Sequence, residues 1–185
     1  MILSRSGSVS AAAASYPDWP YDHSRTPETG SNVYHVDPAA SDDTGDGSIG
    51  DPFQQINTHI GDLVAGDILY LRAGTHSVTS YNMRNTGYPE DGHNDGTSGN
   101  PIIITSYPGE EPTLNCNSQE WLNMDSVDYW HITHLKFTST AMNCLAVGDG
   151  SDQQGLYFFC LDFNTTASTT YGDNAGQIFI DGWGS

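Results

Sequence analysis

The sequence predicts an all-β fold, a right-handed parallel β-helix (a solenoid) of few coils with an N-terminal capping helix. Its 185 residues include 20 glycines and 9 prolines, which supply the frequent turns of an all-β chain. Short apolar runs are centred at Ile104, His131, Phe158 and Phe179, at steps of 27, 27 and 21 residues (104 to 131, 131 to 158 and 158 to 179). Self-similarity at this spacing indicates stacked coils, and crossovers between parallel strands are right-handed.

The first 31 residues are predicted to be an extended, low-complexity arm, because they lack helical and strand periodicity and contain three prolines. The arm carries side chains of the kind that anchor an extended segment in a partner's pockets: Ile2, Leu3, Tyr16, Trp19 and Tyr21. We expect it to bind another protein chain, either a second copy or a shell protein. The alternative is a tail packed on its own cap helix. No apolar core of a secretory signal is recognisable in it.

Residues 32–185 are predicted to form the β-helix domain. A strand at 32–36 and an Asp/Gly-rich loop lead to one amphipathic helix at 53–64, where apolar residues recur at helical spacing. Gly66 and Asp67 end the helix, and a strand with a glycine turn is predicted at 66–78.

The stretch "PIIIT" (101–105) is too short for a helix and lacks the alternation of a surface strand, which fits a strand buried within a β-helix. "SYPGEEP" forms the next corner, and apolar runs at 129–137, 155–163 and 176–183 continue the coils. The expected inward residues are Ile56, Ile60, Leu63, Ile68, Leu71, Ile102, Ile104, Leu114, Trp130, Ile132, Leu135, Phe137, Leu156, Phe158 and Ile178. The cysteines Cys116, Cys144 and Cys160 show no CxxC spacing and are predicted to be small core residues.

Charge and hydropathy limit the partners. Five basic residues against 23 acidic ones give a net charge of -18, which disfavours nucleic acid, anionic membranes and other polyanions unless cations intervene. No apolar run approaches the roughly 20 residues of a membrane span. The acidity fits either solubility in salt or cation binding.

Two acidic loops carry alternating oxygen ligands before a glycine, as calcium loops do. Asp42 and Asp46 lie in the first loop, and Asp91 and Asp95 in the second. Both are half-motifs, because neither has a glutamate at the twelfth position. Calcium is therefore a candidate cofactor, and ordinary turn formation by aspartate is the alternative.

The segment "VYHVDPAASDDTGDGSIGDPF", the cap helix, "RAGTH", "SGNPIIITSYPGEEPTL" and "WLNMDSVDYWHITHLKFTST" resemble the entry of the right-handed parallel β-helix proteins related to chondroitinase B, alginate lyases and pectate lyases. The resemblance covers about residues 32–163 and concerns the cap and the first coils. It implies a scaffold used by lyases and also by tail spikes, adhesins and capsid proteins. In the lyases it implies β-elimination by a basic residue, with Ca²⁺ or arginine neutralising a uronate carboxylate, on coils beyond the end of this chain.

One cluster in this chain could supply such chemistry. It comprises His131, His134 and Lys136: Lys136, the only lysine, is expected at an outward position beside His134, and His131 is expected to face outward one corner earlier. The alternative is an exposed polar face, since no arginine lies nearby in sequence and the acidic surface would repel a polyuronate.

We therefore expect a non-enzymatic β-helix module, a capsid-decorating or tail protein of a virion or another extracellular surface protein, that binds glycans through exposed tyrosine and tryptophan. The alternative is a small or truncated polysaccharide lyase that cleaves uronate-containing glycans by β-elimination. Apolar residues near the end of the chain, including Trp183, predict a homo-oligomer with a trimer favoured, because copies would cover one another's open coils.

Overall fold

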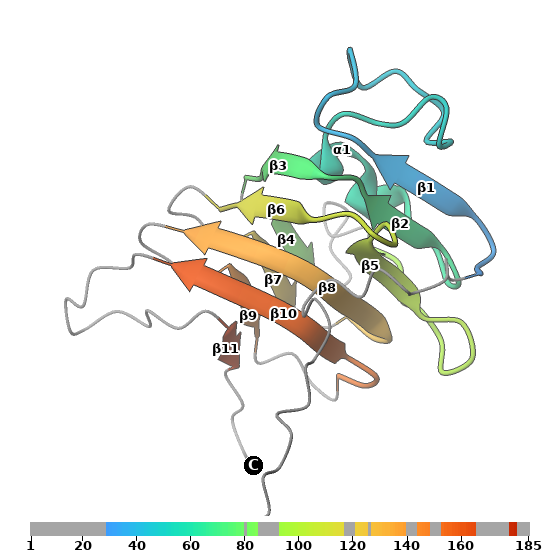
Figure 1. The fold of residues 1–185 in the computed structure, drawn as a ribbon. Coiled ribbons are helices and arrows are strands. Elements are labelled where there is room, and N and C mark those ends of the chain that lie inside the picture. Colours follow the sequence, from blue (N-terminus) through green and yellow to red (C-terminus); the bar gives the residue numbers. More distant parts are fainter. Residues whose placement is uncertain are drawn as a thin grey trace, which may run out of the picture.

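Parallel strands stack in columns in the computed structural model of the chain (Figure 1). The structure describes residues 29–79, 81–84, 93–116, 121–125, 127–139, 144–148, 153–165 and 178–180. The elements in chain order are β1 (Val33–Val36), α1 (Ile56–His59), the 3₁₀-helix η1 (Ile60–Asp62), β2 (Ile68–Leu71), β3 (Gly74–Ser77), β4 (Tyr81–Arg84), β5 (Ile102–Ser106), β6 (Pro112–Asn115), β7 (Leu122–Asp125), β8 (Trp130–Ser139), β9 (Leu145–Val147), β10 (Tyr157–Thr165) and β11 (Ile178–Ile180).

The strands follow one another in coils. β1 belongs to the first coil, and coils 2 to 5 begin at β2, β5, β8 and β10. The first arm of the sheet contains β1, β2, β5 and the first halves of β8 and β10. The second arm contains β3, β6 and the second halves of β8 and β10, while β4, β7, β9 and β11 form a separate sheet. The predicted all-β parallel β-helix is confirmed, including its small number of coils.

The interior is apolar along most of the described coils, with the buried His76 in line with Leu114 as a polar exception. Of the residues expected to face inward, those buried are Ile56, Ile60, Leu63, Ile68, Leu71, Ile102, Ile104, Leu114, Trp130, Ile132, Leu135 and Phe137. Leu156 and Phe158 are partly buried and pack against the core, and the side chain of Ile178 lies outside the described part. These apolar layers are what the sequence pattern predicts for a solenoid.

Ile68 is the exception within that set, because its side chain lies on the outer face of β2. Leu69 and Leu71 belong to the core cluster, so strand alternation places Ile68 on the other face. It is buried there because the chain near Gly30 covers it: a Cβ on Gly30 would lie 2.9 Å from Ile68 Cδ1. The expected inward position of Ile68 is therefore wrong, although its burial is correct.

The cap helix is shorter than the predicted span of 53–64. Phe53 still forms a bridge with Val36, and Gln55 remains extended with φ -117° and ψ 127°. The carboxylate of Asp43 accepts hydrogen bonds from the Gln54 and Gln55 amides, each 2.9 Å long, and so holds this stretch outside the helix. The chain becomes extended again at Leu63. Short polar contacts thus overrule helical periodicity at the N-terminal end of the predicted span.

The corner between the two arms differs from coil to coil. Coil 3 turns through the loop 107–111, whereas coils 4 and 5 turn at one residue each, His134 and Cys160. Both residues are in the left-handed region, with φ of 54° and 51°. One residue in this conformation bends the strand and shifts the in-out alternation, so that Leu135 and Phe137 face inward beyond it.

Several predictions fall outside the described residues. These are the arm with Ile2, Leu3, Tyr16, Trp19 and Tyr21, the aspartate Asp91, and the terminal Trp183. Their roles in partner binding, calcium binding and self-association stay predictions. Within the described ranges, no helix is both long enough and apolar enough to cross a membrane.

Candidate functional site

The long strands β8 and β10 build the outer surface of coils 4 and 5. Their register pairs Tyr157 with His131 and Phe159 with Thr133. Ile132 is in the core, so alternation places the neighbouring His131 and Thr133 on the outside. β10 repeats this pattern and directs Tyr157 and Phe159 to the same outer face.

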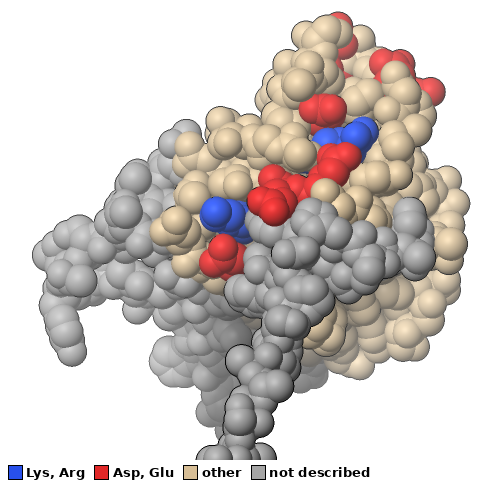
Figure 2. Space-filling model, in the orientation of Figure 1, with Lys and Arg blue, Asp and Glu red and all other residues tan. Residues whose placement is uncertain are grey.

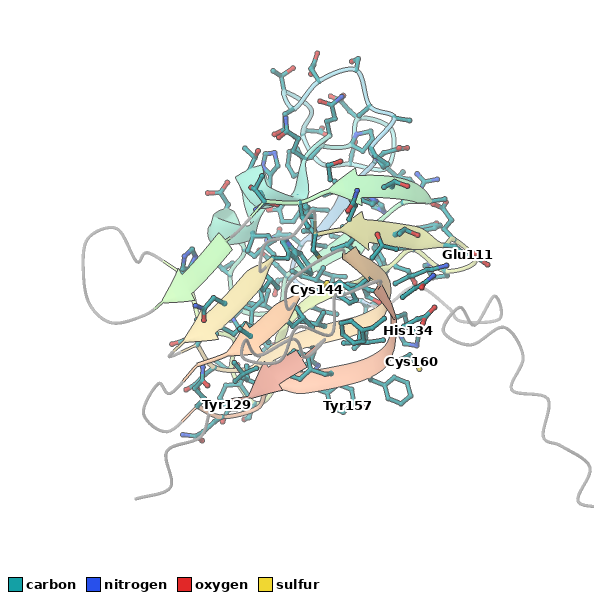
Figure 3. All side chains as sticks on the ribbon, turned by 90° about the vertical axis from the view of Figure 1, so that its left-hand side faces the viewer. Glu111, Tyr129, His134, Cys144, Tyr157 and Cys160 are labelled. Carbon is teal, nitrogen blue, oxygen red and sulfur yellow. The ribbon has the colours of Figure 1, made fainter. Side chains whose placement is uncertain are left out.

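Four rings form the main feature of this face, which we call the aromatic platform: His131, His134, Tyr157 and Phe159. The rings of Tyr157 and Phe159 lie nearly parallel, at 17° and with centroids 5.9 Å apart. The ring centroids of His131 and Tyr157 are 5.3 Å apart. His134 meets Phe159 edge-on, with ring centroids 5.6 Å apart. Tyr157 projects away from the ribbon, and His134 lies beside Cys160 at the bend (Figure 3).

The platform is exposed although most of its atoms are apolar. Tyr157 and Phe159 are each 48% exposed. Large side chains of this kind usually avoid water, and adjacent exposed rings mark ligand-binding or interaction surfaces. The neighbouring imidazoles add polar atoms to an otherwise apolar surface.

The same outward row is closed in the earlier coils. Register places His35, Tyr70 and Thr105 in line with Thr133 and Phe159. His35 stacks on Tyr70 at 5.6 Å, and the ring of Tyr107 meets Tyr70 edge-on at 5.4 Å. All residues of this row before Phe159 are buried. The row therefore becomes exposed to solvent only at its last described strand, β10.

An ion pair holds the corner that covers this row. Arg72 donates three hydrogen bonds to the carboxylate of Glu110, at 2.6 to 2.9 Å, and its guanidinium lies over the ring of Tyr107 at 5.1 Å. Burial alone would raise the pKa of Glu110, but the hydrogen bonds from Arg72 and from the Ala73 amide hold it below its usual value. The pair fixes the loop 107–111 against β2.

Charged groups continue across the bend. The register places Lys136 beside Asp162 of β10 and Thr113 of β6. Figure 2 shows this face, on which basic groups lie between acidic groups along one band. A ligand bound on the platform would thus lie next to a second arm that carries both a basic and an acidic side chain.

The candidate catalytic residues lie on one strand but not on one surface. His131 belongs to the first arm, His134 occupies the bend, and Lys136 lies on the second arm. The structure brings the two histidines into contact with β10 rings rather than with Lys136. A catalytic role for these three residues stays a prediction.

The candidate calcium ligands make turn contacts. Asp42 accepts hydrogen bonds from the amide and hydroxyl of Thr44, and these lower the pKa of Asp42. Asp46 accepts from the Ser48 amide and Asp95 from the Asp128 amide. Among the residues that the structure describes, no three His, Cys, Asp or Glu side chains gather as a metal-binding group. Turn formation accounts for Asp42 and Asp46, and calcium binding stays a prediction.

Tyr157 and Phe159 were not among the site residues predicted from the sequence. The available signal was the alternation of "LYFFCLDF" (156–163), in which every second residue before Cys160 faces outward. β10 thus carries an exposed tyrosine, and glycan binding through it stays a prediction.

Comparison with known proteins agrees with this architecture. A solved structure described as "Rhamnogalacturonan lyase" superimposes with a TM-score of 0.51 at 18% identity, over 74% of this chain and 37% of that one. This likeness concerns the fold, and the chain spans little more than a third of that protein. No curated protein matches the chain. Residues 34–175, most of the chain, match the family described as Pel9A-like, right handed beta helix region. The predicted relation to pectate-lyase-like β-helix proteins is thereby confirmed, and the chain belongs to the Pel9A-like right-handed β-helix family.

Proposed function

We propose that this chain binds a polysaccharide on the aromatic platform. The observation that carries the proposal is the pair of parallel, half-exposed rings of Tyr157 and Phe159 on one face of β10. A sugar ring presents a face of C–H groups that an aromatic ring can cover and a rim of hydroxyls that imidazoles can bind. Sites for such ligands combine apolar area with a few placed polar groups.

The charge of the protein favours a neutral glycan. A net charge of -18 repels a polyuronate at long range, although Lys136 lies close to the platform. The chain's family and the printed name of its structural neighbour both support a carbohydrate ligand. The binding test therefore compares neutral polymers with uronate polymers.

Electrophoresis in native gels containing each polymer tests the proposal. A neutral polysaccharide should retard the wild-type protein, and the double variant Tyr157→Ala/Phe159→Ala should migrate as it does without polymer. The control is Ile49→Ala, because Ile49 is also an exposed apolar residue, 53% exposed, but lies in the loop before α1. Equal retardation of the wild type and the double variant would refute the platform as the binding site.

A lyase is the second candidate. It is favoured by the basic side chains His131, His134 and Lys136 on the strand that carries half of the platform, and by the name of the structural neighbour. Uronate polymers incubated with protein and Ca²⁺ are the substrates to test. Our proposal expects no rise in the ultraviolet absorbance of unsaturated ends. A rise that Lys136→Ala abolishes would establish the lyase instead.

The proposal retains the setting expected from the sequence: a non-enzymatic surface module, on a virion or outside the cell, that self-associates with a trimer favoured. Light scattering on the purified chain measures the association. A monodisperse monomer at micromolar concentration would refute self-association while leaving glycan binding to its own test.

A further inference from the structure

Two cysteines of successive coils lie at one corner of the β-helix. Cys116 directly follows β6 in coil 3, and Cys144 directly precedes β9 in coil 4. The Cys116 amide donates to the Thr138 carbonyl at 2.9 Å, and the Trp121 amide donates to the Cys144 carbonyl at 3.0 Å. These bonds join the two coils on both sides of the same corner and fix the backbone at each cysteine.

Both side chains point into the same core. Cys116 and Cys144 are fully buried members of one cluster, and their side chains are near enough to interact. Figure 3 shows Cys144 inside the β-helix, whereas Cys160 lies at its outer bend. The hydrogen bond to Cys144, together with burial, holds the pKa of the Cys116 thiol far above its usual value. In the folded protein the Cys116 thiol is therefore protonated and slow to react.

We propose that Cys116 and Cys144 are a disulfide-forming pair that covalently joins coils 3 and 4. Two buried thiols of one core cluster, on neighbouring coils that backbone hydrogen bonds join beside each cysteine, are an arrangement in which such a bond can form. Cys160 differs because it is half-buried and occupies the left-handed bend. The bond is expected to form during folding, before the corner is closed to solvent.

The oxidant is a low-molecular-weight disulfide such as oxidised glutathione. One cysteine, as thiolate, attacks a glutathione sulfur, which forms a mixed disulfide and releases one glutathione thiolate. The second cysteine thiolate attacks the protein sulfur of that mixed disulfide and releases the other glutathione. The two cysteines lose two protons and two electrons, and the glutathione disulfide is reduced to two thiols.

Refolding the full chain in glutathione buffer, followed by alkylation in denaturant and peptide mapping, tests the pair. The expected result is one cross-linked peptide containing Cys116 and Cys144, with Cys160 alkylated. The oxidised protein should also unfold at higher urea concentration than the reduced protein, because the bond closes a loop in the unfolded chain. The same urea shift should persist in Cys160→Ala and vanish in Cys144→Ala.

Alkylation of all three cysteines after refolding in the oxidising buffer would overturn the proposal, as would a cross-link that includes Cys160. The mapping uses the wild-type chain, so the result does not depend on the folding of Cys144→Ala. Equal urea midpoints of the oxidised and reduced wild type would also contradict the proposal, because a closed loop must restrict the unfolded chain.

Discussion

Replacing Phe159 by alanine should weaken polysaccharide binding about sevenfold. An aromatic side chain offers about 200 Å² of surface, and the 48% exposure of Phe159 leaves about 100 Å² in water. Covering all of it would contribute about 2.5 kcal/mol at 25 cal/mol per Å². A sugar covers one face of the ring, about half of that area, so about 1.2 kcal/mol is lost, which corresponds to about sevenfold in Kd.

Calorimetric titration of a neutral oligosaccharide that the native gels identify measures this loss. Tyr157→Ala should give a similar loss, whereas Ile49→Ala should bind as the wild type does. Circular dichroism checks that the variants remain folded. The two platform variants are coupled through ring contact, so the loss in the double variant need not equal the sum of the single losses. An unchanged Kd in both single variants would refute the assignment of the rings to the ligand.

Three further predictions concern the scaffold. Phe137→Ala should lower the free energy of unfolding in urea by about 3–5 kcal/mol, because the ring is fully buried and stacks on Phe163 at 4.8 Å; a loss below about 1 kcal/mol would contradict this packing. His134→Gly should be more stable than His134→Ala by about 0.5–1 kcal/mol, because only glycine adopts a φ of 54° without strain, and equal stabilities would contradict the bend. Glu110→Gln should flatten the acid side of the stability profile measured by urea unfolding. Since the pKa of Glu110 is lowered by Arg72, its contribution is present above the unfolded pKa of about 4.3 and is lost as pH falls through the lower folded value; a profile identical to wild type would contradict this.

The core was predictable from the sequence because every coil must bury its apolar side chains in the same way. Ile102, Ile104 and Trp130 had to face inward, since a solenoid buries apolar residues against the coils on either side. Ile68 was misplaced for a physical reason: its strand is buried on both faces, and a continuous apolar run carries no signal of which face is the inner one. The segment at Gly30 that covers its outer face is far away in sequence.

A corner between His131 and Lys136 was expected from the sequence, but the residue at which the chain bends was not predictable. A left-handed residue is most often glycine, and histidine and cysteine occupy these positions in coils 4 and 5. Nothing in the local sequence marks His134 or Cys160 as corners. Their equivalence appears only when the register aligns Leu135 with Leu161 on adjacent coils.

Corner length and position in the stack of coils together explain why the platform lies where it does. In coil 3 the loop 107–111 is long enough to return over the first arm, and its Tyr107 lies against His35 and Tyr70 while Arg72 and Glu110 hold it in place. In coils 4 and 5 the corner is a single residue, which leaves no loop to cover the adjacent row. Thr133 of coil 4 is nevertheless buried between Thr105 and Phe159 of the adjacent strands, whereas Phe159 on the last described strand of the row is half exposed. The platform therefore combines two features: a corner that carries no covering loop, and a place at the last described strand of the row.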